Sequence, residues 1–209
     1  MAPTNSCSPR SAPRHPLDIS PDGGLLLYEE GDAADGWDLL ALPLPVPPPG
    51  APGTPGGEPA PEPEPIAVSR SPVNDRRGQF SPDGRWVLYE SDESQQSEIY
   101  LQPFPGPGQR IRVSAAGGAQ PRWRRDGREL HFVALDRHLM AAAVRFAPGG
   151  QSADVGVPVP LFRTALGDLH ATTARFDHVA SPDGSRFLMH TEPVATTPIG
   201  VILNWRRLP

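Results

Sequence analysis

The sequence predicts an all-β fold built from repeated antiparallel sheets, and three observations support this prediction. A turn motif recurs four times, short strand-like segments follow the copies in the same order, and the copies are spaced like structural repeats. The copies read ISPDGGLLLYEE (19–30), FSPDGRWVLYES (80–91), WRRDGRELHFVA (123–134) and ASPDGSRFLMHT (180–191). Such repetition is typical of a fold that uses one structural unit several times.

The Ser-Pro-Asp-Gly string predicts a tight reversal of the chain. Pro presets φ for a turn, the Asp side chain can bond the local backbone, and Gly adopts positive φ without steric cost. The segments that follow, RWVLYES (85–91) and SRFLMHT (185–191), are rich in β-branched and aromatic residues, as strands require. Each copy therefore predicts a hairpin of two strands.

Further strands are expected behind each hairpin. The next strand is expected at WDLLALPL (37–44), SEIYLQPF (97–104), RHLMAAAV (137–144) and PIGVILNW (198–205). Another strand, RIRVS (110–114) or VPLFRTA (159–165), then closes a unit before the next one begins at QPRW (120–123) or RFDHVA (175–180). Four short antiparallel strands per unit is the composition of a propeller blade. We therefore predict a partial, open β-propeller of three to four four-stranded antiparallel blades.

The spacing of the turns agrees with blades that carry insertions. The turn aspartates, Asp22, Asp83, Asp126 and Asp183, are 61, 43 and 57 residues apart. Only the middle interval is near the roughly 40 to 45 residues of a four-stranded blade. The Pro/Gly-rich segment 43–65 lengthens the first interval, and longer loops at 147–156 and 167–174 lengthen the third.

The predicted organisation is a disordered tail at 1–16 and a partial propeller at 17–209, with 43–65 a disordered and dispensable insert. No helix is predicted, because no stretch keeps a 3.6-residue apolar period without Pro or Gly. Inward-facing residues of neighbouring blades should form the core: Leu26, Tyr28, Phe80, Val87, Tyr89, Trp123, Phe132, Phe187 and Met189.

Composition excludes several classes of function. All 19 basic residues among the 209 are Arg, so the chain offers no phosphate-loop lysine, no protein-kinase lysine and no Schiff base. The net charge of −5 and the scattered arginines disfavour nucleic acid as a partner. The single cysteine, Cys7, cannot form an intramolecular disulfide. No signal peptide and no membrane segment are expected, since neither an apolar N-terminal region nor a run of eighteen apolar residues is present.

The segment QFSPDGRWVLYESDESQQSEIYLQPFPGPGQRIRVSAAGGAQPRWRRDGRELHF (79–132) resembles the TolB-like, WD40-like propeller repeat of bacteria. The resemblance covers about 17–44 and 66–205. The ending TPIGVILNWRRLP (197–209) is similar to the C-terminus of propellers that close receptor-type serine/threonine protein kinases. This resemblance implies a sensing or binding role. The chain departs from the TolB-like repeat at Arg124 and Arg125, where Ser and Pro are usual. It also departs in the number of blades, since TolB-like propellers usually have about six.

Candidate chemical sites are better explained structurally. The Asp-Gly turns lack the spacing of a calcium loop. The six histidines, His15, His131, His138, His170, His178 and His190, show no metal-binding spacing, so packing or surface positions are expected. Ser20, Ser81 and Ser181 lie in repeated turns and not in a nucleophile elbow. In RWRRDGR (122–128), Trp123 should take the core position of Phe80, with the arginines solvated rather than bound to nucleic acid.

The sequence therefore predicts no catalytic residue, no cofactor and no metal, while leaving the ligand-binding residues unknown. The expected function is a non-enzymatic binding or sensing scaffold whose loops hold a protein, a peptide or a small ligand. The alternative is an accessory domain separated from a receptor-type kinase or a prolyl oligopeptidase-like peptidase. The missing neighbours of the end blades would be upstream propeller blades or a second copy. The compartment stays open: extracytoplasmic for a receptor-kinase sensor, otherwise cytoplasmic.

Overall fold

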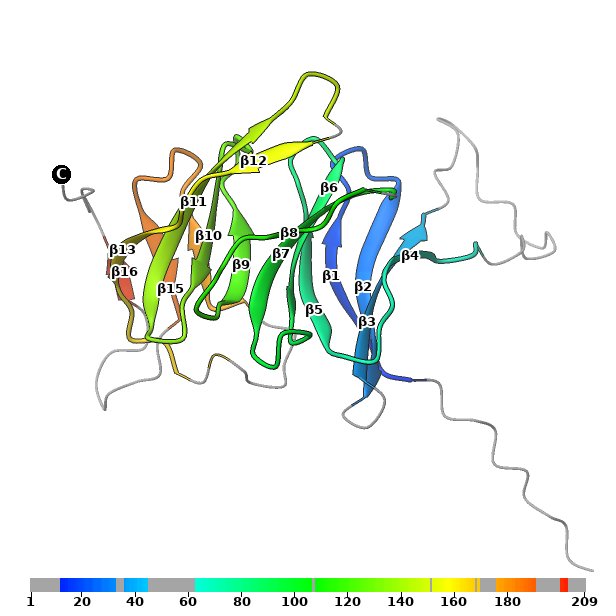
Figure 1. Cartoon of the computed structure of the whole chain (residues 1–209), viewed down its shortest axis with the longest axis horizontal. Helices are drawn as coiled ribbons and strands as arrows, with labels where there is room; N and C mark the ends of the chain where they lie inside the picture. Colours follow the sequence, from blue (N-terminus) through cyan, green and yellow to red (C-terminus); the bar gives the residue numbers. More distant parts are fainter. Residues whose placement is uncertain are drawn as a thin grey trace, which may run out of the picture.

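The computed structural model describes residues 12–32, 36–44, 63–106, 108–150, 152–167, 169, 176–190 and 200–202. These residues contain β-strands and no helix. The strands form four antiparallel sheets that lie side by side like an open fan, with the first and the last sheet at opposite ends (Figure 1). The predicted all-β fold, a partial propeller that does not close, is confirmed.

Each sheet is one blade, and its strands follow the chain order except in blade III, where β12 and β13 both pair with β11. Blade I contains β1 (Arg14–Ile19), β2 (Leu25–Asp32), β3 (Gly36–Pro43) and β4 (Ile66–Ser69). Blade II contains β5 (Asp75–Phe80), β6 (Trp86–Ser91), β7 (Glu98–Pro103) and β8 (Ile111–Arg112). Blade III contains β9 (Ala119–Trp123), β10 (Glu129–Val133), β11 (His138–Phe146), β12 (Ala153–Val155) and β13 (Val159–Arg163). Blade IV contains β14 (His178–Ala180), β15 (Phe187–Met189) and β16 (Gly200–Ile202).

The structure differs from the predicted elements at three points. Strand β12 lies in the segment 147–156 that was predicted as a loop, because the long strand β11 extends beyond β13 and offers its edge to a second partner. Strand β4 was not predicted. Strand β1 begins at Arg14, so the predicted boundary at residue 17 falls inside it. The tail 1–11, the insert 45–62 and most of the ending 197–209 lie outside the described residues.

The repeated turn folds as its residue types predict. Asp83 accepts hydrogen bonds from the Ser81 hydroxyl at 2.6 Å and from the Arg85 N–H at 3.2 Å. The Trp86 N–H in turn donates to Ser81 Oγ at 3.0 Å, which ties the first residue of β6 to the turn. Gly84 has φ 72°, a conformation that Gly adopts without strain. The third copy lacks the Ser, and Arg124 bonds Asp126 through Nε at 2.8 Å instead.

The core lies between neighbouring blades and not within one. Phe80, Val87 and Tyr89 of blade II pack against Leu27 and Leu39 of blade I, and similar clusters join blade II to III and blade III to IV. The predicted core residues are buried in these clusters apart from Leu26 and Tyr28. Tyr28 is buried outside the clusters, and Leu26 is partly exposed. Leu26 faces away from blade II, toward the side where no described blade precedes it.

Two hydrogen bonds repeat between the first strands of neighbouring blades. Asp18 of β1 accepts from the Phe80 N–H of β5, and Gln79 of β5 accepts from the Trp123 N–H of β9, both at 2.9 Å. We call this contact, made by positions 18 and 79, the strand lock. It fixes the angle between blades because the acceptor and the donor belong to different sheets.

A second contact repeats where each first strand begins. Glu29 of blade I accepts from the Arg77 N–H, and Glu90 of blade II accepts from the Gln120 N–H. Arg77 and Gln120 have φ of 51° and 56°, an uncommon conformation for residues other than Gly. The resulting bulge turns a backbone N–H out of its own sheet and toward the preceding blade. We call this contact the glutamate lock.

Candidate functional site

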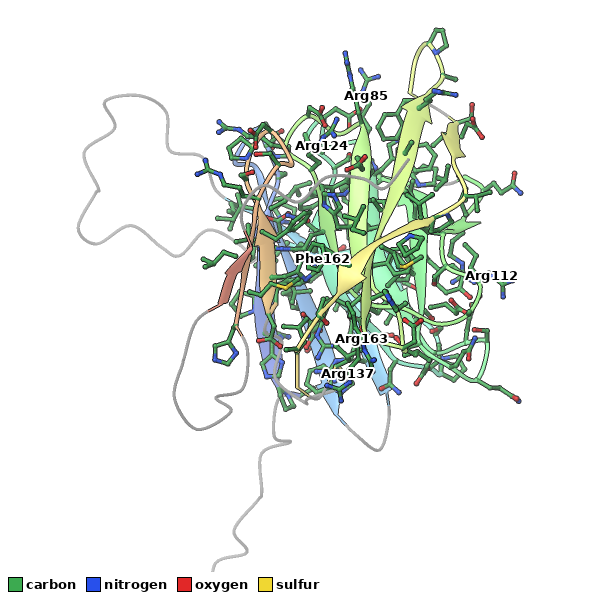
Figure 2. All side chains as sticks on the ribbon, turned by 90° about the vertical axis from the view of Figure 1, so that its left-hand side faces the viewer. Arg85, Arg112, Arg124, Arg137, Phe162 and Arg163 are labelled. Carbon is green, nitrogen blue, oxygen red and sulfur yellow. The ribbon has the colours of Figure 1, made fainter. Side chains whose placement is uncertain are left out.

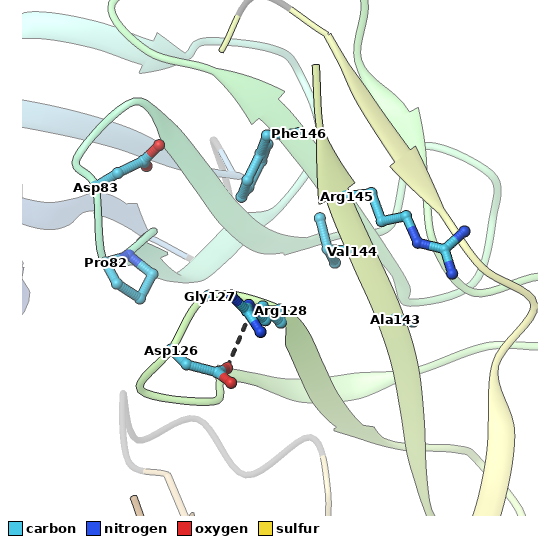
Figure 3. A pocket seen from close by; sticks show the side chains of 9 residues that line it. All are labelled: Pro82, Asp83, Asp126, Gly127, Arg128, Ala143, Val144, Arg145 and Phe146. Carbon is cyan, nitrogen blue, oxygen red and sulfur yellow. Dashed lines mark hydrogen bonds between the residues drawn. The ribbon is translucent and has the colours of Figure 1, made fainter. Parts of the chain in front are cut away.

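A groove lies between the turns of blades II and III, at the end of the molecule that carries the hairpin turns (Figure 3). Its volume is about 740 Å³. Its lining residues come from the two turns and from β11: Pro82, Asp83, Asp126, Gly127, Arg128, Ala143, Val144, Arg145 and Phe146. The volume lies in the range of about 300 to 1,000 Å³ that is usual for ligand pockets.

The two turns hold the charged rim of the groove in place. A β-carbon built on Gly127 would meet Pro82 Cδ at 3.5 Å, so the turn of blade III lies against that of blade II. Asp126 accepts from the Arg128 N–H at 3.0 Å. Hydrogen bonds from the Arg124 guanidinium lower the pKa of Asp126 to about 2. This carboxylate is therefore ionised at neutral pH and paired within its own turn.

The apolar wall of the groove is held by a hairpin that reaches back to blade II. The hairpin joins β11 to β12, and its tip accepts hydrogen bonds at Gly149 O from Arg85 Nη1 and at Gly150 O from Trp86 Nε1. The Phe146 ring lies 5.6 Å from the ring of Trp86, between centroids. The segment predicted as a loop thus bridges two blades and gives the groove a fixed aromatic side.

The groove is chemically suited to binding. Aspartates from both turns and the guanidinium group of Arg128 offer both charge signs around an apolar wall of Val144 and Phe146. The Arg145 side chain lies on the other face of β11 and points away from the turns (Figure 3). The described lining residues include no Ser, Cys or His that could act as a nucleophile or a general base. Within the part of the chain that the structure describes, no group of three or more His, Cys, Asp or Glu could hold a metal ion.

Arginines are distributed over both ends of the fan. Arg85 and Arg124 lie at the end that carries the turns, whereas Arg137 and Arg163 lie at the opposite end (Figure 2). Arg137 donates to the Leu166 carbonyl, so its guanidinium contributes to holding the loop after β13.

The structure corrects one interpretation of the sequence and agrees with others. Trp123 is buried at the core position of Phe80, as predicted. Arg122, predicted to be solvated, is instead half-buried, with its guanidinium carbon 4.3 Å from the centre of the Phe176 ring. The prediction failed because Arg122 belongs to a first strand whose side is covered by blade IV. His131 and His178 are buried between blades III and IV, in packing positions.

Comparison with solved structures identifies the architecture. Over 93% of its length this chain superposes on TolB from Acinetobacter baumannii, with a TM-score of 0.56 and 16% identity. The fold is a partial β-propeller. A β-propeller domain of Cps50 (Swd1) from Myceliophteria thermophila matches 90% of this chain with a TM-score of 0.50 and 10% identity. An oligogalacturonate lyase in complex with manganese matches 88% with a TM-score of 0.52 and 12% identity.

These likenesses concern the fold alone. The chain spans 41% of the Acinetobacter TolB chain, 46% of the lyase and 69% of the Cps50 domain. No family model matches the sequence, and no curated protein is similar to it. The described residues contain no helix that is long and apolar enough to cross a membrane.

Proposed function

We propose that the chain is a non-enzymatic binding or sensing scaffold whose turn-bearing end holds a protein or peptide partner. The observation that supports this most is the groove between the turns of blades II and III, which combines a rigid aromatic wall with charges of both signs. Rigid turns position these groups without loss of side-chain freedom on binding, which favours recognition. A groove open along one side suits an extended peptide better than an enclosed small molecule.

The test is a selection of displayed random peptides on the purified chain. Peptides that use the groove should lose at least about tenfold in affinity for an Arg128→Glu variant, because a charge-assisted contact becomes a repulsion. A matched Arg112→Glu variant, on strand β8 away from the groove, should bind them unchanged. Selected peptides that bind the wild-type chain and the Arg128→Glu variant equally would contradict the proposal.

We also propose that the chain is the C-terminal part of a larger propeller. Ile19 is 55% exposed, although Phe80 and Trp123 are buried at the same position of blades II and III. Leu188 is 49% exposed, although Leu27 and Leu88 are fully buried at the same position of blades I and II. Both end blades thus expose apolar positions that a neighbouring blade covers elsewhere.

Upstream propeller blades are the proposed neighbours, and a second copy of the chain is the alternative. Solution scattering on the purified chain separates the cases. An open monomeric fan supports upstream blades, and a stable dimer supports self-association. A compact, closed, monomeric disc would contradict both. The accessory-domain alternative would be supported by a kinase or hydrolase reading frame directly upstream.

A further inference from the structure

The junction of blades III and IV departs from the repeated strand lock. Asp18 and Gln79 each accept a backbone hydrogen bond from the following blade. At the same position blade III has Arg122, whose guanidinium can only donate. The N–H that would be locked is that of Ala180. An acceptor has therefore been replaced by a cation at one junction out of three.

The glutamate lock is also absent at this junction. Glu29 and Glu90 align with Val133, which has no polar side chain. Gln120 takes over part of the role, because its Oε1 accepts from the Asp177 N–H at 2.9 Å and its Nε2 donates to Asp177 Oδ2 at 3.0 Å. The contacts that hold the first two junctions have thus been exchanged at the third for groups of different chemistry.

Polar groups without partners gather at the same place. His178 is 3% exposed, and neither of its ring nitrogens has a hydrogen-bond partner. Among the described residues, no hydrogen bond or ion pair reaches the Arg122 guanidinium, which lies over the Phe176 ring. A buried donor without a partner costs about 1 to 3 kcal/mol. Native structures rarely retain such groups without a role that uses them.

A cavity of about 240 Å³ lies against these two side chains. Phe176, Val179, Leu188 and Met189 supply its apolar lining, and Arg122 and His178 are among its polar groups. The cavity is smaller than the pockets of drug-sized ligands, so it fits a small molecule with an apolar body.

The charges around the cavity limit the ligand to a single negative charge. Arg122 is the cation, and burial lowers its pKa while the more distant Asp18 raises it. Burial, together with His131 and Arg122, lowers the pKa of His178 to about 3, so His178 is neutral and offers one N–H. Asp177 also lines the cavity, and its carboxylate contacts Gln120 and the His190 ring. Arg122 can pair with one negative charge, whereas the second charge of a dianion such as phosphate would have no cation and would face the Asp177 carboxylate.

We infer that the cavity between blades III and IV binds a small monocarboxylate with an apolar body. Arg122 would hold the carboxylate through its planar guanidinium, which matches the two oxygens in a bidentate pair. His178 would donate a neutral hydrogen bond, and the body would lie against Phe176 and Met189. This site is separate from the groove of the proposed function and uses the opposite side of blade III.

Calorimetric titration of the full chain with hexanoate tests the inference, with uncharged hexanamide as the matched probe. Hexanoate should bind saturably and hexanamide at least about tenfold more weakly, because only the acid makes a charge-assisted contact. An Arg122→Gln variant should lose hexanoate binding by about tenfold or more. Gln is the residue that makes the strand lock at position 79, so the variant should keep its melting midpoint.

Two further variants complete the design. An Arg128→Gln variant changes an arginine of the groove between blades II and III and should bind hexanoate like the wild-type chain. A His178→Leu variant should bind hexanoate more weakly and gives a second measurement if Arg122→Gln does not fold. The inference is wrong if hexanoate fails to bind saturably, if hexanamide binds equally, or if the folded variants at positions 122 and 178 bind hexanoate like the wild-type chain.

Discussion

Replacing His178 by Leu should change how the stability of the chain depends on pH. The His178 ring is buried with both nitrogens unpaired, and burial, followed by the charges of His131 and Arg122, lowers its pKa to about 3. A free histidine has a pKa of about 6.5. The unfolded chain therefore binds a proton at mildly acidic pH that the folded chain does not accept. The folded chain therefore keeps its full stability above about pH 6.5, and the stability that depends on neutral His178 is lost as the pH falls toward 3.

The size of the effect follows from the two pKa values. A pH of about 4.5 is about two units below the pKa of His178 in the unfolded chain, so the ring is protonated there. In the folded chain the ring is still neutral at this pH. Each unit corresponds to about 1.4 kcal/mol, so the wild-type chain should lose about 2 to 3 kcal/mol between pH 7 and pH 4.5 through this residue. The His178→Leu variant has no proton to bind at this position and should lose none of this. At pH 7 it should be at least as stable as wild type, because two unpaired polar atoms are removed.

Urea unfolding of both proteins at about pH 7 and about pH 4.5 measures the difference, since other titrating groups cancel between them. A His138→Leu variant is the control, because the His138 side chain is 38% exposed and should not produce the same divergence from wild type. If the His178→Leu substitution changes the unfolding free energy by the same amount at both pH values, burial does not govern the ionisation of His178. The reasoning would then be refuted.

Three other substitutions test the packing between blades and the insert. Gly78→Ala places a methyl group 2.9 Å from a leucine of blade I and should lower the unfolding free energy, measured by urea denaturation, by about 1 to 3 kcal/mol. The control Gly106→Ala meets nothing within 4 Å and should leave the unfolding free energy unchanged in the same assay. Glu90→Ala leaves the buried Arg77 guanidinium without this carboxylate and should lower the unfolding free energy by about 3 to 5 kcal/mol. Glu93→Ala removes a more exposed ion pair and should lower it by less than about 1 kcal/mol. Equal losses of unfolding free energy for the two variants would contradict this prediction. Replacing 45–62 by a short Gly-Ser turn should leave the melting midpoint nearly unchanged by calorimetry, and a large decrease would show that the insert packs on the blades.

The sequence predicted well those features that depend on neighbours along the chain. The turns at Ser81 to Gly84 and at Ser181 to Gly184 form because each residue type satisfies its own local backbone. The strands that follow these turns, β6 and β15, were predicted from the apolar, aromatic and β-branched residues of RWVLYES (85–91) and SRFLMHT (185–191). Strand β12 escaped prediction because its three residues are too few to form a strand pattern, and they become a strand only when the free edge of β11 is present.

The sequence by itself determined the repeat, the all-β class and the order of strands, since these arise from contacts between residues close in the chain. Only the tertiary structure decided which side of each blade is covered. In the sequence, Arg122 is indistinguishable from a solvated arginine, but in the structure its guanidinium lies over the Phe176 ring. In the sequence, His178 is an ordinary strand residue, but in the structure both of its ring nitrogens are buried without hydrogen-bond partners. The two locks join residues about 30 to 60 positions apart, and a carboxylate or an amide in the sequence does not show which distant N–H it will meet. Burial and pairing between blades depend on the angle at which whole sheets pack, and no local pattern contains that angle.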